Sequence, residues 1–312
     1  MYDIACIGIL VADVICKPVH KIPERGKLGF IDSVKLYNGG GAMTAAINLK
    51  KLGANTAILG KVGEDGLGMF LKGILDSKKV NTDGLVIDPD VDTSASVVIV
   101  DGGGERTFLH CKGSNGAYRL EDVDFDIIAD SNIVFFTGST LMDAIDGEPT
   151  AKLLKKCKEM GKITALDLAW DDSGRWMELV GPSLPYVDYF LPSIEEAIEL
   201  SGETELDKIS DVFFKKGAKH VIIKVGKDGC YYRESPESAG KTIPTFPGKP
   251  VDTTGAGDSF CSGFLYGISI GLTIEQACVV GNATGTQCVL SVGATSGAKT
   301  YEEICDFIEA NS

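Results

Sequence analysis

The chain has 312 residues, 44% of them hydrophobic and 24% charged, a balance that excludes disordered and fibrous classes and allows a sizeable core. Its formal net charge of −14 argues against attraction to nucleic acid or to anionic lipid. The N-terminus lacks a signal-peptide pattern, and no window approaches 18 consecutive apolar residues, so we predict a cytoplasmic protein without a membrane span.

Short apolar segments alternate with helix-period segments along most of the chain. Residues 4–11 form an apolar run too short for a typical helix, which predicts a buried strand. Further strands are predicted at 56–60, 133–136, 163–167, 189–191 and 220–225, and helices at 42–52, 68–79, 148–160, 194–200 and 207–216. This alternation predicts an α/β fold, a doubly wound and mostly parallel sheet with helices on both faces. No linker, repeat or low-complexity tract divides the chain, so we expect one domain over residues 1–312.

Two segments, residues 12–38 and 91–112, depart from this alternation. Within the second, residues 97–100 and 106–110 flank the turn Asp101–Gly104, which predicts a pair of hairpin strands. A small β-sheet beside a large α/β domain suggests a lid over a cleft. The strands of such a lid either stay within one subunit or pair between two subunits. A homodimer formed through the lid is therefore one of two alternatives that the sequence leaves undecided.

Nine cysteines form no C-x-x-C pair, and most of them lie in apolar runs. We interpret them as buried thiols of a reducing compartment and expect no zinc site.

The segment Asp252–Asp258, D-T-T-G-A-G-D, precedes a four-residue recurrence of Phe260, Phe264 and Ile268, so a helix is predicted to begin near Asp258. Small residues before a helix expose N–H groups at its positive end, which makes an anion hole. A carboxylate there can accept a proton from a substrate hydroxyl while the amides hold the phosphoryl group under attack. Taken alone, the segment also fits an ordinary helix start in which Asp258 complements the helix dipole.

The nine residues D-T-T-G-A-G-D-S-F resemble the C-terminal signature of the ribokinase-like (PfkB) carbohydrate kinases. The resemblance implies a ribokinase-like fold with a small β-sheet lid, and ATP-dependent phosphorylation of a primary hydroxyl of a small sugar or sugar derivative. Mg²⁺ and a monovalent cation such as K⁺ are the implied cofactors. The resemblance assigns the role of catalytic base to Asp258, the anion hole to Gly255, Ala256 and Gly257, and the binding of the monovalent cation to Asp252.

Residues 39–68 resemble a second signature of the same family, which lies nearer the N-terminus. Residues 39–41 are three glycines that open a small-residue run ending in Leu52-Gly53, and residues 60–68 read G-K-V-G-E-D-G-L-G. Residues 8–13 also resemble the family's first strand, whose aspartate binds sugar hydroxyls. The implied substrate-binding residues are Asp13, Gly39, Gly40, Gly41 and Thr44. Because the family often has a substrate-contacting Asn where this chain has Thr44, the substrate pattern is not carried over unchanged.

Further resemblances concern the nucleotide. Residues 193–196 resemble an N-x-x-E motif whose Glu orders the magnesium shell, with Ser193 in place of Asn. Residues 224–229 resemble a T-x-G-x-x-G turn near the ATP phosphates, with Lys224 in place of a hydroxyl residue. The implied nucleotide-binding residues are Ser193, Lys224, Gly226, Gly229 and Asn282; Glu196 is implied for Mg²⁺ through water, and Thr254, Ser291 and Gly293 for the monovalent cation. Each also fits an ordinary turn or helix contact.

Two other functions stay open. A nucleoside kinase of the same family would line its pocket with aromatic residues, and the region around Asp13 and Gly40 offers few besides Phe30 and Tyr37. We therefore favour a sugar or sugar acid. A non-catalytic sugar- or nucleotide-binding protein of the same fold is suggested by Thr44 and Ser193. The intact G-A-G-D segment argues against it.

Overall fold

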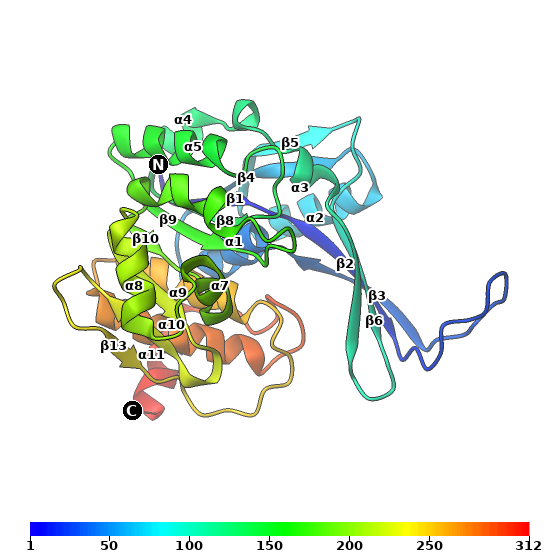
Figure 1. The fold of residues 1–312 in the computed structure, drawn as a ribbon. Coiled ribbons are helices and arrows are strands. Elements are labelled where there is room, and N and C mark those ends of the chain that lie inside the picture. The colour runs from blue at the N-terminus through cyan, green and yellow to red at the C-terminus, as the bar shows by residue number, and fades with distance from the viewer. Residues whose placement is uncertain (312) are drawn as a thin grey trace.

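The computed structural model describes residues 1–311 and contains two β-sheets (Figure 1). The larger sheet has the order β13-β12-β11-β10-β9-β8-β1-β4-β5. Its neighbours pair in parallel from β5 to β11, and β12 and β13 are added antiparallel at one edge. The predicted α/β fold with a mostly parallel sheet is confirmed.

The large sheet is built from β1 (Tyr2–Gly8), β4 (Thr56–Gly63), β5 (Asn81–Asp88), β8 (Ser131–Ser139), β9 (Ile163–Leu168), β10 (Tyr189–Phe190), β11 (His220–Lys224), β12 (Cys230–Arg233) and β13 (Lys241–Ile243). The helices are α1 (Gly41–Leu52), α2 (Gly66–Ser77), α3 (Gly113–Ala117), α4 (Phe125–Ala129), α5 (Glu148–Glu159), α6 (Trp176–Val180), α7 (Ile194–Ser201), α8 (Leu206–Lys215), α9 (Ala256–Ser269), α10 (Ile274–Val289) and α11 (Tyr301–Ala310), with 3-10 turns η1 (Leu120–Asp122), η2 (Gly181–Tyr186) and η3 (Gly226–Asp228).

Side chains of the central strands alternate between two hydrophobic cores, one on each face of the sheet. Along β1, Ala5 and Ile7 join the core that includes residues of α5 and α8, whereas Ile4 and Cys6 join the core that includes residues of α1 and α9. A strand buried on both faces needs apolar residues at every position, which is why these strands are continuous apolar runs in the sequence.

The predicted strand over residues 4–11 is wrong at its C-terminal end. The chain leaves the large sheet at Gly8, where φ is 144°, and Val11 already begins a strand of the second sheet. Leu10 and Ala12 remain buried through this change of sheet, so the apolar run continues without marking the boundary.

The second sheet, hereafter the lid, consists of β2 (Val11–Lys17), β3 (Ser33–Gly39), β6 (Ala95–Val100) and β7 (Arg106–Cys111) in the order β3-β2-β6-β7. Strands β6 and β7 pair antiparallel on either side of the predicted turn at residues 101–104. The lid strands project from one side of the molecule (Figure 1).

All nine cysteines are free, and Cys6, Cys157, Cys230, Cys261, Cys278 and Cys288 are buried. No helix within residues 1–311 is long and apolar enough to cross a bilayer.

Asp65, the acidic residue of the G-K-V-G-E-D-G-L-G segment, joins α2 to the base of the lid. Its carboxylate accepts the Gly68 N–H at 2.7 Å, capping α2. It also accepts the Thr93 N–H at 2.7 Å and the Thr93 hydroxyl at 2.8 Å. The Thr93 hydroxyl in turn accepts the Gly63 N–H at 2.9 Å, so one side chain orders both the helix start and the segment leading into β6.

We expect Asp65→Ala to lower the free energy of unfolding by about 2 kcal/mol, because it removes a helix cap and leaves the Thr93 groups without their acceptor. Urea unfolding measures this. Asp65→Asn should keep much of the cap, and the exposed neighbour Glu64→Ala should change stability by less than about 0.5 kcal/mol. Equal stabilities for Asp65→Ala and Glu64→Ala would contradict this role.

Candidate active site

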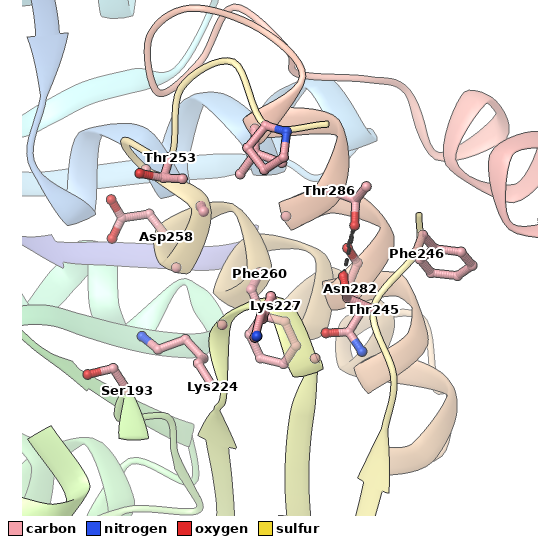
Figure 2. A pocket seen from close by; sticks show the side chains of 18 of the residues that line it. Ser193, Lys224, Lys227, Thr245, Phe246, Thr253, Asp258, Phe260, Asn282 and Thr286 are labelled. Atoms are coloured by element: carbon pink, nitrogen blue, oxygen red, sulfur yellow. Dashed lines mark hydrogen bonds between the residues drawn. The ribbon is translucent and has the colours of Figure 1, made fainter. Parts of the chain in front are cut away.

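A cavity of about 1010 Å³ lies at the carboxyl ends of β9 and β11, between the segment after β13 and helices α9 and α10. Its lining includes Asp167, Ser193, Glu196, Lys224, Gly226, Lys227, Gly229, Phe246, Gly255, Ala256, Gly257, Asp258 and Asn282. In Figure 2 the Lys224 and Ser193 side chains point toward the side of the cavity where Asp258 lies, whereas Asn282 and Phe246 lie at the other end. The predicted nucleotide residues from separate segments thus share one elongated cavity.

The N-terminus of α9 carries the predicted anion hole. Gly255 caps the helix with φ 76°, and a side chain there would collide with Ala294, so both conformation and packing require glycine. The Ala256 N–H donates to the Thr253 carbonyl at 3.2 Å. Within residues 1–311 the N–H groups of Gly255 and Gly257 have no acceptor, which leaves them available to an anion at the positive end of the helix.

Asp258 lies in the first turn of α9 and lines the cavity. Burial raises the pKa of Asp258 to about 7; the nearby Asp167 and Glu196 carboxylates add to this shift, and Lys224 opposes it. A carboxyl group with a pKa near neutrality both accepts and releases a proton readily at neutral pH, as a general base requires.

Lys224, at the end of β11, forms an ion pair with Asp167 of β9, with Nζ 2.6 Å from Oδ1. The Cys261 thiol donates to the other Asp167 carboxylate oxygen at 3.5 Å. Both charged side chains are almost inaccessible, at 13% and 2% exposure. Asp167 was not predicted as a site residue, although an acidic residue at the carboxyl end of a buried parallel strand was a signal for it.

Ser193 and Glu196 form a capping box at the start of α7. The Glu196 carboxylate accepts the Ser193 N–H at 2.7 Å, and the Ser193 hydroxyl accepts the Glu196 N–H at 3.3 Å. Burial raises the pKa of Glu196, Lys224 opposes the shift, and Asp167 adds to it.

The chemistry of Glu196 fits a magnesium ion held through water. One Glu196 oxygen, Oε1, has no hydrogen-bond donor within residues 1–311, and it belongs to a residue that lines the cavity. No cluster of three or more His, Cys, Asp or Glu in that part of the chain is arranged to hold a metal. Mg²⁺ usually keeps several waters and needs only one or two carboxylates together with substrate phosphates.

The turn after β11 and the helix α10 form the remaining walls. Gly226 and Gly229 have φ values of 59° and 97°, so this turn requires its glycines. The Asn282 amide donates to the carbonyls of Ile243 and Pro244 at 2.9 and 3.1 Å, which fixes the start of the segment after β13.

The glycines of the N-terminal signature allow three elements to meet. A side chain at Gly39 would collide with the Asp13 carboxylate, and one at Gly41 would collide with Thr137 and lie 3.1 Å from Asp258 Oδ1. Gly40, between them, has φ 88°. The lid strand β2, the start of α1 and the first turn of α9 therefore converge.

Asp13 is the acidic group of this convergence. Burial raises the pKa of Asp13 to about 6, and a hydrogen bond with Ser96 opposes the shift. Thr44, in α1, lies next to the convergence in sequence, but it is 0% exposed and its hydroxyl has no hydrogen-bond partner within residues 1–311. A substrate contact by Thr44 stays a prediction.

Of the other residues predicted for a monovalent cation, two contact Asp252. Its carboxylate accepts the Thr254 N–H at 2.9 Å and the Gly293 N–H at 3.0 Å. Ser291 precedes Gly293 in the same loop after α10. Arg106 of the lid, not predicted at this position, forms an ion pair with Asp252 at 3.0 Å.

The fold is the one found in solved proteins of the ribokinase-like class. The ribokinase of Arabidopsis thaliana, solved with ribose and ATP, has a TM-score of 0.88 and 23% identity over 99% of both chains. An E. coli protein solved with ATP and Mg²⁺ has a TM-score of 0.84 and 22% identity over 100% of both chains.

The family described as pfkB family carbohydrate kinase matches residues 1–300, so the chain belongs to this family and is a carbohydrate kinase. It is 28% identical to an ATP-dependent 6-phosphofructokinase of Thermoanaerobacterium thermosaccharolyticum, over 94% of this chain and 89% of that protein. It is 26% identical to the 2-dehydro-3-deoxygluconokinase of Bacillus subtilis, over 92% of this chain and 91% of that protein. The predicted family is confirmed.

The raised pKa of Asp258 predicts a pH-dependent cost to stability. In the unfolded chain an aspartate has a pKa of about 3.9. The folded protein therefore holds the proton more tightly, and its stability falls as pH rises through the interval up to about 7. Asp258→Asn avoids this loss.

Asp258→Asn should raise the free energy of unfolding by at least about 1 kcal/mol near pH 8 and have little effect near pH 4. Thermal melting of both proteins across this range is the measurement, with the exposed Asp306→Asn as the control. A stabilisation that is independent of pH would rule out titration of Asp258 as its cause.

Proposed function

We propose that the chain transfers the γ-phosphoryl group of ATP to a primary hydroxyl of a small sugar or sugar acid, with Asp258 as the base. The observation that carries this proposal is the position of Asp258. It lines the large cavity, and its Oδ1 faces Gly41 at the convergence with the lid. One carboxylate thus lies between the cavity proposed for the nucleotide and the convergence proposed for the second substrate.

In this proposal ATP lies along the cavity of about 1010 Å³. Its phosphates meet the free amides of Gly255 and Gly257, and its base lies toward Asn282 and Phe246. Lys224 is held by Asp167 at the phosphate end and stabilises negative charge on the transferred group. Mg²⁺, held through water by Glu196, would supply further charge neutralisation for the phosphates.

The sugar is proposed to bind beneath the lid. Strand register places Tyr37, Asp13, Ser96 and His110 in one row across β3, β2, β6 and β7. All four side chains carry groups that can hydrogen-bond a sugar hydroxyl, and the Asp13 carboxylate can accept two such bonds. Together with relatives named for fructose, fructose 6-phosphate and dehydrodeoxygluconate, this row favours a sugar or sugar acid over a nucleoside.

Transfer follows from this arrangement. Asp258 accepts the hydroxyl proton as the hydroxyl oxygen bonds to the γ-phosphorus and the bond from that phosphorus to the ADP oxygen breaks. The amides of α9 and the Lys224 ammonium group stabilise the charge on the transferred group. Residues 1–312 are proposed to act as one kinase domain, and the cytoplasmic location stays a prediction.

The test is ADP formation from ATP and Mg²⁺ with a panel of sugars, sugar acids, polyols and nucleosides. Asp258→Asn should lower kcat by roughly 10²–10⁴-fold, because it removes the base. Lys224→Met should lower kcat by about 10²-fold, because it removes a fixed charge at the phosphate end. Lys227→Met, in the same cavity but exposed, should mainly raise the KM for ATP.

Tight binding of a sugar without any phosphorylated product would instead support the non-catalytic binding protein. Phosphorylation of nucleosides alone would support the nucleoside kinase. Full activity of Asp258→Asn would overturn the assignment of the base.

The outer face of the lid supports a homodimer, which we also propose. Leu36, Val14, Val97 and Leu109 form one cross-strand row on the face opposite Asp13. Leu36, Val97 and Leu109 are exposed at 36%, 36% and 62%, which is unusual for apolar residues on one continuous row. A second copy of the same face is its proposed occupant, since an isologous contact covers both rows at once.

Light scattering should therefore find a dimer for the native chain. Leu109→Glu should weaken dimerisation at least about tenfold, because it places a charge in an apolar contact. The distant surface variant Lys51→Glu should leave the dimer intact. A monomeric native chain at all concentrations would overturn the proposal.

A further inference from the structure

Asp252 is a nearly inaccessible carboxylate just before the anion hole, with its side chain 3% exposed. Its Oδ1 accepts the Thr254 N–H, and its Oδ2 accepts the Gly293 N–H. A carboxylate that is buried in this way and accepts two N–H groups requires a positive partner.

Arg106 supplies that positive charge from the lid. It is the first residue of β7, far from Asp252 in sequence, and its Nη2 lies 3.0 Å from Asp252 Oδ1. Its Nη1 donates to the Thr254 hydroxyl. One planar guanidinium thus contacts two side chains of the same turn, a geometry that the ammonium group of lysine cannot reproduce fully.

The groups expected to hold a monovalent cation are engaged in other contacts. Oxygen atoms are the ligands of such a cation, yet both Asp252 oxygens accept hydrogen bonds. The loop after α10 presents the Gly293 N–H, not a carbonyl, to Asp252. The Thr254 carbonyl accepts the Cys288 thiol at 3.4 Å. No hydrogen bond within residues 1–311 joins Ser291 to Asp252. These residues do not fit the implied cation in this arrangement.

We propose that Arg106 is a positioning residue that replaces the monovalent cation at Asp252 and thereby holds the turn carrying the anion hole. The turn runs directly from Asp252 through Thr254 to Gly255, the residue that caps α9. A displacement of Asp252 or Thr254 therefore moves the amides of Gly255 and Gly257. The inference rests on the proposed function for its effect on catalysis, but not for its effect on stability.

This contact also links the lid to the phosphate end of the site. Arg106 is paired across β7 and β6 with Val100, so its position follows that of the lid sheet. A guanidinium that leaves Asp252 exposes a buried carboxylate without a partner, which is costly. The arrangement of the lid seen here therefore favours an ordered anion hole.

The test compares the native chain with Arg106→Ala, Arg106→Lys and Thr107→Ala. Thr107 is the next residue of β7, and its side chain lies on the opposite face of the strand. Each protein is melted, and assayed for phosphorylation of the best sugar of the panel, in KCl and in tetramethylammonium chloride at equal ionic strength.

We expect the melting temperature and kcat of the native chain and of Thr107→Ala to be nearly the same in both salts. Arg106→Ala should melt at a lower temperature in tetramethylammonium and lose about tenfold in kcat, because the anion hole is displaced. In KCl the Arg106→Ala variant should regain much of its lost melting temperature and kcat, because the Asp252 carboxylate, no longer paired with Arg106, can bind K⁺. Arg106→Lys should lie between the native chain and Arg106→Ala.

The proposal is overturned if the native chain depends on K⁺ as strongly as Arg106→Ala does, or if Arg106→Ala responds to the salts as Thr107→Ala does. Failure of the proposed function has a different signature. In that case no sugar is phosphorylated by the native chain in either salt, while the melting temperatures still report whether K⁺ compensates for Arg106→Ala.

Discussion

The ion pair between Lys224 and Asp167 is the interaction on which the site depends. It joins β11 to β9 across β10, which ends at Phe190 and leaves the space in front of it to the two side chains. Glu196 and Asp258 interact with the same pair through space, so one ammonium group faces three carboxylates. Burial is the main cause of the raised pKa of Asp258; the excess negative charge adds to it, and a metal ion arriving with a nucleotide would offset that addition.

Much of the fold could be predicted because burial on both faces of a parallel sheet leaves an apolar run at each strand. The same signal failed near Val11, where the chain changes sheets while Leu10 and Ala12 stay buried. The glycines of the site were also predictable, since Gly255 is required by a positive φ and by contact with Ala294. Steric constraints of this kind act on single positions, so they are visible in the sequence as glycines.

The partners of the charged residues could not be predicted in the same way. Asp167 and Lys224 are 57 positions apart, and Arg106 and Thr254 are 148 apart. Their pairing depends on strand order and on where the lid lies, neither of which has a local signature. Ser193, in contrast, has a partner only three residues away in the sequence. Its hydroxyl completes a capping box with Glu196, so the departure from the family's Asn still leaves the start of α7 capped.

A chain with a net charge of −14 must build a site for a polyanion from local donors. Two kinds of donor line the cavity, the unpaired amides of α9 and the Lys224 ammonium group, while the Arg106 guanidinium pairs with Asp252 in the turn before α9. The first two belong to the large sheet and its helices, and their positions are set by the core. Arg106 belongs to the lid, whose outer row is exposed. The turn that carries the amides is therefore held from the lid only while Arg106 contacts Asp252, which links substrate enclosure to phosphate binding.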